Sequence, residues 1–204
     1  MWLSPEPVTP RTYSRKSMQM TTEILNGIDV PTLEAMADSV KNNPDQRTVA
    51  FRVKTEWKGR TKTVTRVSDY RFVGDTFRRH FEIHADEPGE LLGENTAPNP
   101  QELLMAALNA CMSVGYAASA ATMGIELETL EIETEGQLDL RGFLGLDPTV
   151  KPGYETVRYT VRIRSSAPRE KLEELHRWVM KTSPNFSNFA TAIRMIPNLV
   201  INHP

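Results

Sequence analysis

The chain has 204 residues, of which 25% are charged and 39% hydrophobic, and its formal net charge is -2. This composition is typical of a globular protein and argues against a disordered or fibrous chain. So small a net charge provides no overall field that would attract nucleic acid or a membrane surface, and we expect neither as a partner. A single cysteine cannot form an intrachain disulfide, which favours a cytoplasmic protein.

The first 46 residues read as an N-terminal extension. Residues 1 to about 30 show no periodicity, and their prolines, without a basic start and an apolar run, argue against a signal peptide. Apolar residues then recur at helical spacing, which predicts a short amphipathic helix over about residues 31–42. We therefore expect an extension over residues 1–46 and a single domain over residues 47–204.

Alternating apolar and polar residues follow, and they predict a β-meander with strands over residues 48–56, 61–67 and 76–84. Lys58 and Gly59 suit the first turn, and a loop rich in proline and glycine covers residues 85–98. His80 and His84 would share a face of the third strand. Solvated histidines explain this pair better than a metal site does, so we expect neither a metal nor a cofactor.

A long helix is predicted between Pro100 and Gly124, because residues 103–125 contain no charge. Asn99 is a suitable N-cap, Glu102 stands where a capping box requires an acid, and Gly124 suits the C-terminal end. The length would allow a membrane span, but alanine, serine, asparagine and glycine dilute the hydrophobicity. A helix enclosed by protein on most sides fits better.

A second β unit follows this helix. One strand carries acidic residues on one face, and the next carries arginines on one face: Glu131, Glu133, Glu135 and Asp139, then Arg158, Arg162 and Arg164. Complementary faces predict neighbouring antiparallel strands, with Leu138 and Leu140 on the opposite face of the first strand.

The C-terminal part begins with a helix that starts at Pro168 and ends at Thr182-Ser183-Pro184. Its inward residues are expected to be Leu172, Leu175, Trp178 and Val179. A last short strand is predicted over residues 195–201. Strand-rich runs around two helices predict an α+β protein with antiparallel sheets.

Common catalytic motifs are absent from the sequence: it has no Walker motif, dinucleotide-binding glycines, Cys-x-x-Cys or Gly-x-Ser-x-Gly. The basic segment 52–79 is better interpreted as a solvated sheet face than as a nucleic-acid site. Cys111 is the remaining candidate. A free cysteine often packs as a small hydrophobe, whereas a reactive thiol needs an arginine to stabilise the thiolate and a carboxylate or amide to place that arginine.

Three stretches resemble one known family: residues 93–111, which end in Ala-Leu-Asn-Ala-Cys, then 141–154, and then Ser-Pro-Asn-Phe at 183–186. Over about residues 47–203 the chain resembles the OsmC/Ohr family, the osmotically inducible protein C and organic hydroperoxide resistance proteins. The resemblance implies an α+β fold with antiparallel sheets wrapped around long central helices. It also implies an intertwined homodimer with two sites at its interface.

The resemblance also implies roles for individual residues. In the peroxidases of the family, a cysteine on this helix attacks the hydroperoxide, and an arginine from an early strand activates it. Cys111 matches that cysteine, and Arg60 is the best match for the arginine, with Arg66 and Arg52 as rivals.

A glutamate near the helix start assists in those peroxidases. Its place is taken here by Gln101, whose carbonyl oxygen can still hold an arginine. Glu102, one residue later, either substitutes for the glutamate or only caps the helix with Asn99.

The second cysteine of these peroxidases, which resolves the sulfenic acid, is replaced by serine in Ser183-Pro184. A Cys-Cys cycle within the chain is therefore impossible, and an external small-molecule thiol or dithiol would have to reduce Cys111. The chain thus resembles a one-cysteine subgroup of OsmC-like redox proteins. Two hypotheses stay open: thiol-dependent reduction of organic hydroperoxides, or a binding or carrier protein for a small hydrophobic ligand or sulfur, with a decayed peroxidase site.

Overall fold

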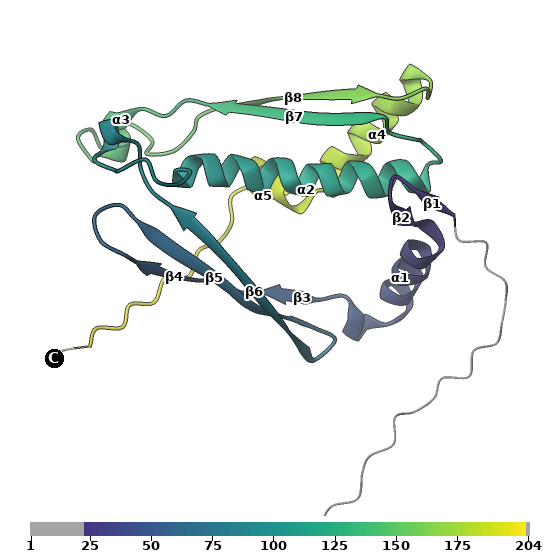
Figure 1. Ribbon diagram of the computed structural model, residues 1–204, viewed down its shortest axis with the longest axis horizontal. Coiled ribbons are helices and arrows are strands. Elements are labelled where there is room, and N and C mark those ends of the chain that lie inside the picture. Colours follow the sequence, from purple (N-terminus) through teal and green to yellow (C-terminus); the bar gives the residue numbers. More distant parts are fainter. Residues whose placement is uncertain (1–22, 203–204) are drawn as a thin grey trace, which may run out of the picture.

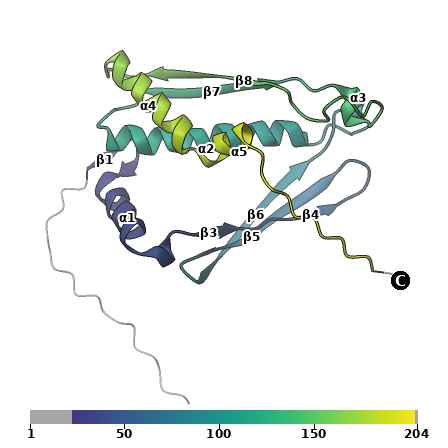
Figure 2. The ribbon, with the colours of Figure 1, turned by 180° about the vertical axis from the view of Figure 1, so that it is seen from behind.

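A computed structural model describes residues 23–202 of the chain. One long helix, α2 (Pro100–Thr122), runs through the middle of the structure (Figure 1). A β-hairpin lies on one side of α2, and a larger sheet and the helix α1 (Val30–Asn42) lie on the other side. Two further helices, α4 (Arg169–Thr182) and α5 (Pro184–Ala190), lie across α2, as seen from behind in Figure 2. This arrangement confirms the predicted α+β class with antiparallel sheets.

The N-terminal elements are β1 (Ile24–Leu25), β2 (Ile28–Asp29), α1 (Val30–Asn42) and the 3-10 helix η1 (Pro44–Gln46). The predicted helix is confirmed, and Asp29 caps it by accepting a hydrogen bond from the backbone N–H of Thr32 at 2.9 Å. The short hairpin β1–β2 was not predicted. Asn26 in its turn binds both the carbonyl of Ile125 and the N–H of Leu127 at 2.8 Å, which holds this segment against the end of α2. Most of the arm expected before residue 30 lies outside the described residues.

The larger sheet contains β3 (Val49–Phe51), β4 (Lys54–Trp57), β5 (Thr63–Phe72) and β6 (Asp75–Ala85), and all its pairings are antiparallel. The single strand predicted over residues 48–56 is therefore wrong. Phe51 pairs with Tyr70, and Lys54 pairs with Arg66. Between these two pairs the chain advances by three residues from β3 to β4 but by four residues along β5. This one-residue mismatch separates β3 from β4.

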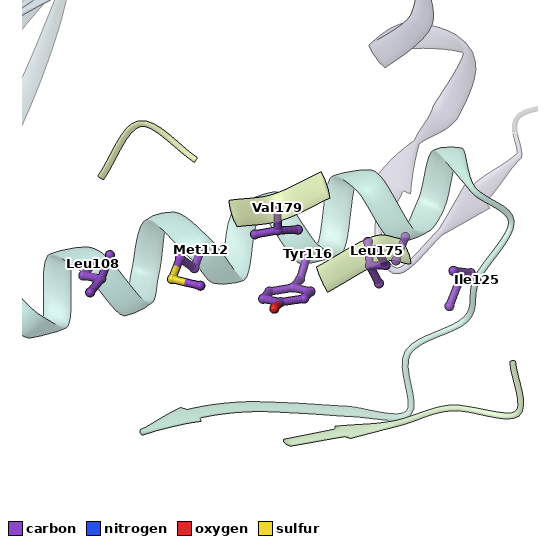
Figure 3. Packing of buried hydrophobic residues seen from close by; sticks show 7 residues of the cluster. Leu108, Met112, Tyr116, Ile125, Leu175 and Val179 are labelled. Carbon is purple, nitrogen blue, oxygen red and sulfur yellow. The ribbon is translucent and has the colours of Figure 1, made fainter. Parts of the chain in front are cut away.

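The capping box of α2 is confirmed, because Asn99 and Glu102 each accept the other's backbone N–H at 2.8 Å. Gly124 has a φ of +67°, as expected just beyond a helix end. The buried stripe of α2 consists of four residues spaced by one turn: Leu108, Met112, Tyr116 and Ala120. Figure 3 shows the first three of these beside Leu175, Val179 and Ile125.

The prediction that α2 is enclosed on most sides is not met within one chain, because Val114 is 69% exposed. By length and composition, α2 is also the helix among residues 23–202 that could cross a membrane. Core helices of soluble proteins pass the same test, and the buried stripe of α2 packs against α4.

The second β unit consists of β7 (Thr129–Gly136), the short helix α3 (Leu140–Phe143) and β8 (Val157–Arg164). The predicted antiparallel pairing is confirmed, and Glu131 lies opposite Arg162. The strand ends at Gly136, however, so Leu138, Asp139 and Leu140 are not part of it. The Asp139 carboxylate instead accepts the N–H of Arg141 at 2.9 Å and begins α3.

The C-terminal part contains α4 (Arg169–Thr182) and α5 (Pro184–Ala190), the second of which was not predicted. Leu175 and Val179 are fully buried, but Trp178 is 46% exposed, so its predicted inward position is wrong. The buried stripe of α4 is centred on Leu172, Leu175 and Val179, and the position of Trp178 around the helix axis puts it at the edge of this stripe. Residues 195–201 form no strand, because they have no neighbouring strand to pair with among the described residues.

Candidate functional site

Cys111 lies midway along α2 and is partly buried. Its Sγ lies 3.5 Å from the Oγ of Ser183, which is only 4% exposed. The serine that replaces the expected second cysteine is thus in direct contact with the thiol. The structure therefore brings together two positions that 72 residues of chain separate.

Contacts on both sides of Cys111 hold the α4–α5 junction against α2. One turn before the cysteine, the amide of Asn185 donates to the carbonyl of Ala107 at 2.8 Å. One turn after it, Gly115 has no side chain, and a Cβ added there would lie 3.3 Å from the Cγ1 of Val179. Glycine thus lets α4 approach closely, which places Ser183 beside the sulfur.

A cavity of about 570 Å³ opens next to this junction. Leu104 and Leu108 line it from α2, and their spacing to Cys111 puts all three residues on one face of the helix. The other apolar walls come from β8 and α5: Tyr159, Phe186 and Phe189. Phe186 also connects the cavity to the thiol, because its N–H donates to the Oγ of Ser183 at 3.3 Å. Cys111 does not itself line the cavity, which also has polar walls: Lys151, Glu155, Thr156 and Asn188. A mostly apolar cavity thus begins one turn of α2 from the cysteine.

Arg60 lies on the tight turn between β4 and β5, where Gly59 and Arg60 both have positive φ angles of +98° and +50°. Its Nη1 lies 2.8 Å from the Oε1 of Glu94, in the loop that leads to α2. Lys62 pairs with the other oxygen of the same carboxylate. The hydrogen bonds from Lys62 and Arg60 hold the pKa of Glu94 below its usual value.

Arg66 and Arg52 are engaged elsewhere on the sheet. Arg66 pairs with Glu56 at 3.1 Å and with Glu82 at 2.9 Å, and Arg52 pairs with Asp69 at 2.8 Å. Hydrogen bonds from Lys58, Arg66 and Lys54 lower the pKa of Glu56 to about 2. Within residues 23–202, none of the three candidate arginines hydrogen-bonds to Cys111.

Glu102 and Gln101 are also not in contact with the cysteine. They lie nine and ten residues before Cys111 on α2, which places them about 14 and 15 Å away along the axis. The Glu102 carboxylate accepts the N–H of Asn99 at 2.8 Å and completes the cap. Capping is therefore the role of Glu102 in the single chain.

Asp86 is a buried residue of this region that the sequence reasoning missed, with only 1% of it exposed. Its carboxylate accepts hydrogen bonds from the hydroxyls of Thr61 and Thr96 at 2.6 and 2.7 Å. Three backbone N–H groups, those of Glu87, Glu94 and Thr96, add to these. The hydrogen bonds hold its pKa well below the usual range, against the opposite effect of burial. The sequence did contain a signal for this residue, because Asp86 is an acid that directly follows the end of a strand and precedes a loop rich in proline and glycine.

No three histidine, cysteine or acidic side chains among the described residues form a group suited to a metal ion. His80 and His84 both lie exposed on β6. The thiol of Cys111, one turn of α2 beyond the cavity wall at Leu108, is therefore the nucleophilic group that we assign to this site.

Residues 93–196, just over half of the chain, match the family model described as OsmC-like protein. The chain belongs to the OsmC-like protein family. A search of the curated proteins found no match.

Solved structures support the fold of this OsmC-like protein. An OsmC-like protein from Mycoplasma pneumoniae is 14% identical with a TM-score of 0.56, over 70% of this chain and 88% of the other. A protein of Psychrobacter arcticus 273-4, described as an osmotic stress induced and detoxification response protein, is 18% identical with a TM-score of 0.52, over 67% and 85%. At these identities the similarity establishes the architecture alone.

Proposed function

We propose that this OsmC-like protein reduces organic hydroperoxides through Cys111, with an external thiol as the reductant. The observation that carries the proposal is the position of the Cys111 thiol, in contact with a buried hydroxyl and one turn from an apolar cavity of about 570 Å³. Apolar walls favour the organic part of a hydroperoxide over hydrogen peroxide. Membership of the OsmC-like family supports redox chemistry of this kind. The proposal includes a cytoplasmic location, where small thiols are kept reduced.

The reaction balances with one hydroperoxide and two thiols. The Cys111 thiolate attacks the distal oxygen, the O–O bond breaks, and the alkoxide that leaves takes a proton to become the alcohol. Cys111 is then a sulfenic acid. A first external thiol displaces water and forms a mixed disulfide, and a second thiol releases the external disulfide and restores Cys111.

Arg60 is our candidate for stabilising the thiolate. Of the three candidate arginines, it is the one that pairs with the segment leading into α2, through Glu94. Because Arg60 does not reach Cys111 in the same chain, the proposal requires it to act on the thiol of a second subunit. Gln101, near the start of α2, would help to orient it there.

Exposed apolar surface supports such a homodimer. The rings of Phe51, Tyr70 and Phe77 lie in contact, with centroids 6.0 and 5.0 Å apart, yet Phe51 is 73% exposed and Phe77 41%. Val114 on α2 is 69% exposed. Exposed apolar groups of this kind mark association surfaces. The mass of the native protein by light scattering tests this, and Val114→Asp should shift it toward a monomer.

A second candidate function is favoured by Ser183, which removes the family's internal resolving step. In this alternative the cavity holds a small hydrophobic ligand, or Cys111 carries sulfur, without turnover. Native mass spectrometry of freshly purified protein distinguishes the two: a bound ligand or a persulfide supports the carrier function.

The deciding experiment measures consumption of cumene hydroperoxide in the presence of dithiothreitol. Turnover should disappear in Cys111→Ser. Ser113→Ala is the matched control, because Ser113 lies two residues further along α2 and its hydroxyl donates to the carbonyl of Asn109 in its own helix. Turnover at the wild-type rate in Cys111→Ser would overturn the proposal.

A further inference from the structure

We propose that Ser183 is a catalytic residue whose hydroxyl donates a hydrogen bond to the Cys111 thiolate. The inference rests on the proposed function, because it assigns a role within the same site. The residue that replaces the second cysteine would thus stabilise the thiolate of Cys111, the form that attacks the peroxide. The contact that carries it is the 3.5 Å distance between the two side chains.

The hydrogen-bond partners of Ser183 indicate the direction of donation. A serine hydroxyl has one proton to donate and two lone pairs that accept. The N–H of Phe186 already donates to the Oγ at 3.3 Å, so one lone pair is used. Because Ser183 is only 4% exposed, its proton needs a protein acceptor, and the sulfur of Cys111 is the one within reach among the described residues.

The backbone of Ser183 is held firmly at the junction of two helices. Its N–H donates to the carbonyl of Val179 at 2.8 Å and ends α4, and its carbonyl accepts the N–H of Ser187 at 3.0 Å in α5. Asn185 fixes the same junction to α2. The hydroxyl is therefore prepositioned at the sulfur before any substrate binds, which is what electrostatic stabilisation of a nucleophile requires.

The hydrogen bond has two opposing effects on reactivity. It favours the thiolate over the thiol, which raises the fraction of attacking species at neutral pH. It also makes each thiolate less nucleophilic, with a Brønsted coefficient of about 0.4–0.5. A hydrogen bond to a charged group typically favours that group by about tenfold, and the loss of nucleophilicity reduces this to a net gain of about threefold in rate at neutral pH. At strongly alkaline pH, where every thiol is ionised, only the second effect remains.

These effects give a test on the resting protein: alkylation of Cys111 by iodoacetamide as a function of pH. Ser183→Ala should react about threefold more slowly than wild type at pH 7 and faster at about pH 10. Ser183→Gly should behave in the same way while retaining most of the capping of α5, because glycine is a good N-cap. Ser187→Ala, one exposed turn further along α5, should follow wild type at both pH values.

Curves for Ser183→Ala and Ser183→Gly that coincide with wild type would overturn the role of Ser183. So would a change of the same sign at both pH values, because that indicates altered access and not a lost hydrogen bond. Far-UV circular dichroism establishes that each variant is folded. The readout needs no peroxide, so failure of the proposed function appears separately, as absent turnover in a wild-type protein that still shows the alkylation difference.

Discussion

The hydroxyl of Thr61 donates to the buried carboxylate of Asp86 at 2.6 Å, and this bond joins the turn that carries Arg60 to the loop that precedes α2. The other carboxylate oxygen accepts the N–H groups of Glu94 and Thr96. One buried charge thus organises both halves of the Arg60–Glu94 pair. Its loss should loosen the turn and the loop together.

Asp86→Asn should reduce the dependence of stability on acid pH. Because hydrogen bonds hold the pKa of Asp86 well below its usual value of about 3.9, the stabilisation is fully present above that value and is lost as pH falls toward the lowered pKa. The variant should be less stable at pH 7 and decline less steeply below pH 5. Urea unfolding at several pH values measures this, with Asp38→Asn on the exposed face of α1 as control. Parallel curves for wild type and Asp86→Asn would contradict the expectation.

Arg60→Gln should slow peroxide consumption by about 10²-fold, the usual effect of removing one charged or hydrogen-bonding group that stabilises a reacting centre. Arg66→Gln is the control, because Arg66 already pairs with Glu56 and Glu82 on the exposed sheet. Steady-state rates with cumene hydroperoxide compare them. Equal losses in both variants would remove the special role of Arg60.

Local patterns predicted the elements that depend on local interactions. The capping box at Asn99 follows from side chains three residues apart, and the antiparallel pairing of β7 with β8 follows from their complementary charged faces. The break between β3 and β4 did not, because alternation continues through Arg52 and Val53 while the register against β5 shifts by one residue. Residues 195–201 are mostly apolar, as in a short buried strand, but have no pairing partner within the described chain.

The candidate site was predictable to a similar extent. The position of Cys111 on its helix and the substitution at position 183 could be read from the sequence. Their contact could not, because it depends on Gly115 admitting α4 and on the amide of Asn185 binding Ala107. The sequence also could not predict which thiol Arg60 approaches, because within one chain Arg60 pairs with Glu94.

Ser183→Cys should convert the protein to one that forms a disulfide within the chain. The Oγ at position 183 lies 3.5 Å from the Cys111 sulfur, and small rotations of both side chains would bring two sulfurs to bonding distance. One equivalent of peroxide should then lower the mass by two hydrogens. In wild type the same treatment should leave a sulfenic acid that dimedone traps. A Ser183→Cys protein that keeps two free thiols after peroxide would show that the two positions are farther apart in solution.

Leu175→Ala should destabilise the fold by about 2–5 kcal/mol, the usual cost of a cavity at a fully buried leucine. Leu175 is 0% exposed and packs in the cluster that joins α4 to α2. Trp178→Ala on the same helix should cost less despite the larger side chain, because 46% of Trp178 is exposed. Urea denaturation of the two variants measures the difference. The reverse order would mean that Trp178 is buried in solution, for example by a second subunit.

Tyr116→Phe should cost about 1–3 kcal/mol, because it leaves the Nδ1 of His176 without the buried phenol that bonds to it. Burial raises the pKa of Tyr116, so its contribution is fully present below the usual value of about 10 and is lost as pH rises through the raised one. Burial also raises the pKa of Tyr159 and Tyr154, so an alkaline titration followed by tyrosinate absorbance should show several late groups in wild type. Tyr116→Phe should show one late group fewer, whereas Tyr70→Phe should keep them all. An unchanged late amplitude in Tyr116→Phe would contradict the protection of Tyr116.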